Sequence, residues 1–128
     1  MIAVDTSALI AIAMDGAEAE ACMQILETEP VLLLSAGTVT EALIVAGGRG
    51  LRQEMDKLLG GLPFDIVPVT DAEARRAADA YALWGKGFHP AKLNFGDCFA
   101  YALAKERNCP LLYVGNDFSR TDIASALA

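Results

Sequence analysis

Four acidic residues, Asp5, Glu41, Asp97 and Asp117, are far apart in the chain, and each lies near the end of a predicted strand or the start of a predicted helix. Carboxylates that meet within a few ångström raise each other's pKa and repel unless a cation lies between them. Without nearby His or Cys, the ligand set is all oxygen, which selects a hard cation such as Mg²⁺ or Mn²⁺. Such an ion with open water positions suits attack on a phosphodiester. The four acids therefore predict a metal-dependent site if the fold brings them together.

The best-defined acid lies in the stretch from Leu93 to Ala104. Asn94 suits an N-cap, because its side-chain oxygen can accept from backbone N–H groups at a helix start. Asp97 then falls in the first turn, where the positive end of the helix favours an anion. The residues that follow, 99–104, are apolar or aromatic, so we expect a largely buried helix that holds Asp97 firmly.

Short apolar strands alternate with helices along the chain. The predicted strands are Ile2–Val4, Val31–Leu34, a short one within Phe64–Val69, and Leu111–Val114. The predicted helices are Ser7–Met14, Ala17–Glu27, Val39–Ala46, Leu51–Leu59, one from Thr70 to Trp84, and Phe95–Arg107, with capping boxes at Thr38–Glu41 and Thr70–Glu73. No hairpin signal joins two strands, so the pattern predicts an α/β fold: a three-layer α/β/α sandwich with a short, mainly parallel central sheet.

Ligands of open parallel sheets bind just outside the carboxyl ends of the strands. Asp5 follows the first strand and Asp117 follows the last one. Glu41 and Asp97 lie near the starts of helices that begin at the same edge. The topology thus places all four acids at one rim, with Asp122 as a fifth candidate.

Each acid also has a purely structural interpretation. Glu41 can be the capping partner of Thr38, Asp97 a complement to the helix dipole, Asp5 an N-cap, and Asp117 and Asp122 ordinary turn or cap residues. Only their coincidence at one rim favours catalysis.

Small hydroxyls and basic residues accompany the acids. Thr6, Ser7 and Ser119 could bind a metal-bound water or orient a carboxylate, although Ser7 and Ser119 are at least as well explained as turn or cap hydroxyls. Arg49, Arg52, Lys86 and Lys92 flank glycine-rich breaks and are candidates for a surface that faces phosphates, although simple solvation is the more common role of any one of them. Arg49, Lys86 and Lys92 are the candidate contacts for RNA. His89, the single histidine, lies in a basic loop and is expected to be exposed to solvent.

Composition narrows the class of protein. The 128 residues predict one domain spanning 1–128, and 54% hydrophobic with 21% charged residues excludes a disordered chain. A net charge of −7 argues against electrostatic coating of nucleic acid. Apolar runs are too short for a membrane span, and no signal peptide is evident. Three cysteines without C-x-x-C spacing disfavour zinc and disulfides and predict a cytoplasmic protein.

Four segments together resemble a PIN domain, and more narrowly the VapC toxins of bacterial type II toxin–antitoxin pairs. They are Ile2–Leu9, Thr40–Ala42, Gly85–Cys98 and Gly115–Asp122. The resemblance implies a Mg²⁺- or Mn²⁺-dependent ribonuclease whose metal site is formed by the positions Asp5, Glu41, Asp97 and Asp117, with Asp5 and Asp97 as the usual direct ligands. It further implies a supporting hydroxyl at Thr6 or Ser7, and Asp122 close by.

The same resemblance implies partners. VapC proteins are held inactive by a cognate VapB-like antitoxin, act on RNA, and commonly form homodimers. A competing hypothesis is a catalytically inactive PIN-fold module that binds RNA or an antitoxin. A phosphate-handling receiver-like or phosphatase domain is a weaker alternative, because no D-x-D follows the first strand and no Lys follows the last.

Overall fold

The computed structural model describes residues 1–127 and contains four strands and six helices in this range. Their bounds are β1 Ile2–Val4, α1 Thr6–Ala13, α2 Ala19–Thr28, β2 Leu32–Ser35, α3 Ala36–Gly48, α4 Arg52–Gly61, β3 Phe64–Val67, α5 Asp71–Trp84, α6 Phe95–Glu106 and β4 Leu111–Leu112. Among these residues no helix is both long and apolar enough to cross a membrane.

The sheet has the order β3-β2-β1-β4, and all pairs are parallel. Ala3 of β1 is in register with Leu33 on one side and Leu111 on the other. Beyond β4, a single parallel bridge joins Leu111 to Ser125, so the last segment of the chain lies along that edge. The predicted parallel α/β fold is confirmed.

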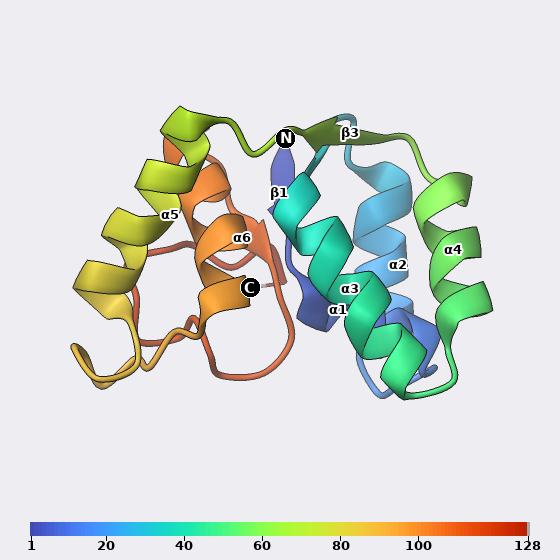
Figure 1. The fold of residues 1–128 in the computed structure, drawn as a ribbon. Helices are drawn as coiled ribbons and strands as arrows, with labels where there is room; N and C mark the ends of the chain where they lie inside the picture. Colours follow the sequence, from blue (N-terminus) through green and yellow to red (C-terminus); the bar gives the residue numbers. More distant parts are fainter. Residues whose placement is uncertain (128) are drawn as a thin grey trace.

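Alternation along the strands divides the core into two layers. Ala3 and Leu33 pack with residues of α5 and α6, whereas Ile2, Val4 and Leu32 pack with residues of α1 to α4. Figure 1 shows α5 and α6 on one side of β1 and the other four helices on the other side. Because helices cover both faces, β1, β4 and residues 32–34 of β2 are buried and apolar, as is typical of parallel sheets, whereas the edge strand β3 carries the exposed Asp65.

Two local predictions were wrong. The predicted capping box at Thr38–Glu41 does not form, because α3 begins earlier: Ser35, the last residue of β2, accepts from the N–H of Gly37 at 3.1 Å. The last strand ends at Leu112 rather than Val114, because the Val114 N–H donates to the Ser7 hydroxyl at 3.0 Å instead of to the sheet.

Of the other predicted caps, the box at Thr70–Glu73 forms only in part and the cap at Asn94 forms. Thr70 accepts from the N–H of Glu73 at 3.2 Å, but the Glu73 carboxylate pairs with Arg76 rather than completing the box. At α6 the full capping box forms between Asn94 and Asp97.

Candidate active site

Asp5 lies directly after β1 and is 3% exposed. Its Oδ2 caps α1, accepting from the backbone N–H of Ser7 at 3.0 Å and from the Ser7 hydroxyl at 2.7 Å. Its Oδ1 is buried and has no hydrogen-bond partner in the described chain. Burial, and to a lesser extent the charge of Glu41, raises the pKa of Asp5 to about 6, although the bonds from Ser7 oppose the shift. One oxygen is therefore fixed and the other is left for a ligand.

Asp97 is held at the start of α6 by reciprocal bonds with Asn94. Asp97 Oδ2 accepts from the Asn94 N–H at 3.0 Å, and the Asp97 N–H donates to Asn94 Oδ1 at 2.9 Å. Burial raises the pKa of Asp97 to about 7, and the charges of Asp5, Asp117 and Glu41 contribute in that order. The four acids are thus close enough to act on one another electrostatically.

Glu41 reaches this cluster from the second turn of α3. Its carboxylate accepts a hydrogen bond from the Thr6 hydroxyl, which links α3 to the start of α1. It also lies against Gly96, where a Cβ would collide with the carboxylate. Glu41 is therefore no capping partner of Thr38, and the absence of a side chain at position 96 makes room for it.

Asp117 comes from the loop after β4 and is exposed. The next residue, Phe118, is buried and packs against the ring of Tyr113 at 5.1 Å between centroids. The bond between the Val114 N–H and the Ser7 hydroxyl ties the start of this loop to the Asp5 cap. The loop that carries Asp117 is therefore anchored at both sides of its turn.

These elements enclose one cavity of about 430 Å³, called the acid cavity below. Its lining residues are Asp5, Thr6, Ser7, Ile10, Ala11, Glu41, Val45, Arg49, Asn94, Asp97 and Asp117. All four acids predicted at one rim line it, together with two of the three predicted hydroxyls and Arg49. Their roles in catalysis remain predictions.

Other candidates lie elsewhere. Asp122 does not line the acid cavity: Lys105 pairs with it at 3.0 Å, and the bond from the Tyr101 hydroxyl is the main reason that its pKa is lowered. The Ser119 hydroxyl donates to the Asn116 carbonyl at 2.7 Å and stabilises a turn. Lys86 and Lys92 are exposed and do not line the cavity. The implied position of Asp122 beside the acids is thus incorrect.

His89 is half-buried rather than exposed. Its Nδ1 accepts from the N–H of Ala91 at 2.9 Å, and its ring packs edge-on against Trp84.

Sequence reasoning missed several lining residues. Asn94 was predicted only as a cap, yet it lines the cavity as well. Val45 and Arg49 follow Glu41 at intervals of four residues, so they share a face of α3. This spacing was the signal that could have found Val45. The requirement for Gly96 had no local signal, because its neighbour Glu41 is distant in sequence.

The donors suit a hard, partly hydrated cation. Within residues 1–127, no three Asp, Glu, His or Cys side chains are already arranged to hold a metal ion. Mg²⁺, however, is usually held by one or two protein carboxylates and keeps several waters. The buried Oδ1 of Asp5, which has no partner in the part of the chain that the structure describes, is the observation that fits such an ion, because a buried carboxylate oxygen without a partner is costly.

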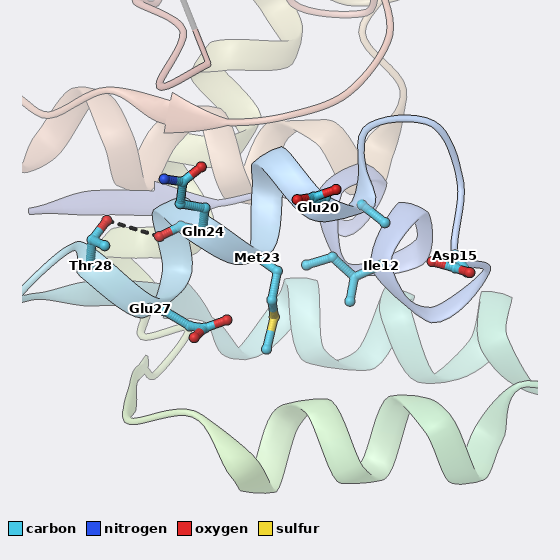
Figure 2. Close-up of a pocket in the computed structure, with 8 residues that line it drawn as sticks. Ile12, Asp15, Glu20, Met23, Gln24, Glu27 and Thr28 are labelled. Carbon is cyan, nitrogen blue, oxygen red and sulfur yellow. Dashed lines mark hydrogen bonds between the residues drawn. The ribbon is translucent and has the colours of Figure 1, made fainter.

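A larger groove of about 540 Å³, called the α1–α2 groove below, lies away from the acids. Figure 2 shows Ile12 and Met23 within it, with Asp15, Glu20 and Glu27 at its edges. None of the candidate site residues lines it.

The fold and the site together are those of an α/β domain with an acidic site at the carboxyl ends of its parallel strands. Comparisons with known proteins identify the family. The PIN domain model matches residues 2–124. Ribonuclease VapC28 of Mycobacterium tuberculosis is 44% identical, with 97% of this chain and 96% of the relative covered. Ribonuclease VapC of Mycolicibacterium smegmatis is 40% identical over 95% of this chain and 97% of the relative. The chain therefore belongs to the PIN domain family and, within it, to the VapC ribonucleases.

Solved structures agree with this fold. M. tuberculosis VapC20, described as a sarcin–ricin loop cleaving toxin, superposes with a TM-score of 0.78 at 16% identity, covering 97% of each chain. A chain of a toxin–antitoxin complex from Klebsiella pneumoniae gives a TM-score of 0.72 at 21% identity, covering 100% of this chain and 98% of that one. At these identities the likeness shows the fold.

Proposed function

We propose that the protein is a metal-dependent endoribonuclease that cleaves RNA phosphodiester bonds with Mg²⁺ or Mn²⁺. The observation that carries this proposal is the meeting of Asp5, Glu41, Asp97 and Asp117 in one cavity, where Asp5 keeps a buried oxygen without a partner among residues 1–127. Ribonuclease is also the activity named for relatives that are 40–44% identical over nearly the whole chain.

Asp5 and Asp97 would hold the ion directly, because both are buried and fixed at the starts of helices. When bound, the ion would offset charge on the phosphodiester and activate water for attack. The Ser7 and Asn94 hydrogen bonds set the directions of the two carboxylates. Glu41, oriented by Thr6, and Asp117 would add negative charge around the ion and accept hydrogen bonds from its waters.

The direct test is cleavage of a labelled single-stranded RNA by purified protein, with Mg²⁺, with Mn²⁺ and with EDTA. We expect cleavage with either ion and none with EDTA. RNA binding without cleavage under all conditions would instead favour a catalytically inactive PIN-fold module.

We propose further that the protein is the toxin of a VapBC-type pair and that a cognate VapB-like antitoxin inhibits it. Several structural neighbours come from toxin–antitoxin complexes, which supports this assignment. Expression alone should arrest growth, and co-expression of the adjacent antitoxin reading frame should relieve the arrest. Arrest that persists in Asp5→Asn would argue against RNA cleavage as its cause.

A homodimer is part of the same proposal. An apolar surface pocket supports it, because Phe95, which is 76% exposed, lines this pocket together with Tyr81 and Phe99. Light scattering on the purified protein measures the mass directly.

A further inference from the structure

Arg49 is the only basic residue that lines the acid cavity in the described part of the chain. It follows α3 as the C-cap, where its backbone N–H donates to the Ala46 carbonyl at 3.1 Å. The guanidinium is thus attached to a fixed helix end rather than to a free loop.

The position of Arg49 relative to the acids follows from the geometry of α3. Glu41, Val45 and Arg49 are spaced four residues apart and all line the cavity. At about 1.5 Å of rise per residue, Arg49 lies about 12 Å along the helix from Glu41. The backbone of Arg49 therefore lies further along the cavity than that of Glu41, and the guanidinium, which contacts Met14 at the C-terminal end of α1, lies toward the same end.

The opposite wall of the cavity, formed by α1, also extends from the acids toward Arg49. On α1, Thr6 and Ile10 line the cavity, and the chain continues to Met14, the C-cap of α1. Arg49 Nη1 contacts Met14 Sδ at 2.9 Å. The two helices thus form walls that run from the acids to Arg49.

The guanidinium remains available to an anion. Across residues 1–127, the ion pairs within 4.0 Å involve Arg52, Arg75, Arg76, Lys105, Arg107 and the N-terminus, but not Arg49. A thioether is a weak acceptor, so exchanging Met14 for a phosphate oxygen would be favourable. The planar fork of an arginine can bind a phosphate through two parallel hydrogen bonds.

We propose that Arg49 binds a phosphate of the RNA strand that flanks the cleaved bond, and so sets the register of the strand across the acids. This inference rests on the proposed ribonuclease function, because it assigns a substrate contact to that site. A protein of net charge −7 needs a local cation of this kind to hold a polyanion beside four carboxylates.

The test compares Arg49→Gln and Arg49→Lys with Arg52→Gln. Arg52 is a matched control, because it lies three residues further on, is exposed, and pairs with Asp56 at 3.3 Å outside the cavity. Binding of a short single-stranded RNA is measured at several salt concentrations in an Asp97→Asn background, where cleavage is suppressed. Arg49→Gln should weaken binding about tenfold and lower the salt slope by about 0.7, the contribution of one phosphate contact on a single strand. Arg49→Lys should retain much of the slope, and Arg52→Gln should change neither.

A second measurement locates the contact. Methylphosphonate linkages, which carry no charge, are placed one at a time along the RNA. At one position, beside the cleavage site but distinct from it, we expect the neutral linkage to weaken RNA binding by the protein that retains Arg49. The same linkage should cause no further loss of binding in Arg49→Gln. Equal, additive losses at every position would overturn the proposal. So would an Arg49→Gln protein that binds RNA as strongly as before but has lost affinity for the antitoxin. Wild-type protein that binds RNA in this pattern but never cleaves it would contradict the ribonuclease proposal alone.

Discussion

The acid cavity and the α1–α2 groove both place carboxylates around open space, but they hold them differently. In the groove, Asp15, Glu20 and Glu27 are exposed; Asp15 lies in the turn between α1 and α2, and the other two lie in α2 (Figure 2). In the acid cavity, Asp5 and Asp97 are buried, and the lining comes from four distant segments. The groove is the larger of the two, so volume alone does not indicate the active site.

The hydrogen bonds that orient the acids also distinguish the two regions. Asp5 is oriented by Ser7, Glu41 by Thr6, and Asp97 by Asn94. In the groove, the one hydrogen bond drawn in Figure 2 joins the Thr28 hydroxyl to the Gln24 carbonyl within α2. Preorganised carboxylates are what a catalytic ion requires, whereas solvated acids on a helix need no functional explanation.

Replacing a buried carboxylate should produce the largest difference in cleavage rate between the acid cavity and the α1–α2 groove. Asp97→Asn removes a negative charge but keeps an oxygen that can accept from the Asn94 N–H, so the fold should persist. We expect RNA cleavage to fall by about 10²–10³-fold or more, the scale of losing one preorganised electrostatic group. The matched control, Glu27→Gln in the α1–α2 groove, should leave the rate unchanged. Cleavage assays with circular dichroism as a folding check decide the matter, and equal rates in both variants would remove the distinction.

Metal removal should affect only the acid cavity. EDTA should abolish cleavage, and Mg²⁺ should stabilise the wild-type protein by about 2.7 kcal/mol at a hundredfold excess over its Kd. The same addition should not stabilise Asp5→Asn, because the buried ligand oxygen is replaced, whereas Glu20→Gln should respond like wild type. Thermal melts with and without Mg²⁺ measure this. A Mg²⁺ response retained in Asp5→Asn would place the ion elsewhere.

The fold could be predicted because its signals are local. Apolar runs such as Leu32–Leu34 and the absence of hairpin turns were sufficient for a parallel sheet, and one topological rule then placed four acids at one rim. The errors arose where a single residue has partners in two elements. Ser35 both ends β2 and caps α3, and Ser7 binds both Asp5 and the backbone of Val114.

Contacts between residues distant in sequence also limit how much of the site could be predicted. Asp122 is near Asp117 in sequence, but its partners Tyr101 and Lys105 hold it away from the acid cavity. The need for a glycine at position 96 depends on Glu41, which is 55 residues away by the difference of the two numbers. Neither effect has a signature in the neighbouring sequence.

That need for glycine is the basis of a smaller expected effect on activity. Gly96→Ala would push the Glu41 carboxylate out of its position, while α6 should still form. We expect cleavage to fall by about 10–100-fold, since a displacement of about 1 Å can cost that much. Gly60→Ala in α4 is the control, because its added Cβ would meet nothing within 4 Å. The kinetic constants of both variants test this, and full activity in Gly96→Ala would show that Glu41 need not lie there.

The pH dependence of stability gives the smallest but most direct measure of how the acids are held. The pKa of Asp97 is about 7 in the folded chain, against 3.8 for an unperturbed Asp, so the metal-free folded state binds more protons than the unfolded state between these values. The contribution of Asp97 to the free energy of unfolding should therefore fall as pH rises from about 4 to 8. At pH 8, Asp97→Asn should be more stable than wild type by roughly 2–4 kcal/mol, at about 1.4 kcal/mol per pKa unit.

Asp122 provides the control of opposite sign. Its pKa is lowered, chiefly by the Tyr101 hydroxyl, so its ionised form stabilises the fold above the pKa of the unfolded state. Asp122→Asn should thus lose stability at pH 8, where Asp97→Asn gains it. Urea denaturation in EDTA at pH 5 and pH 8 measures both variants. If both substitutions changed the free energy of unfolding in the same direction at pH 8, burial of the ionised Asp97 carboxylate would not destabilise the fold. The contrast between the buried acids and the solvated ones would then not hold for Asp97.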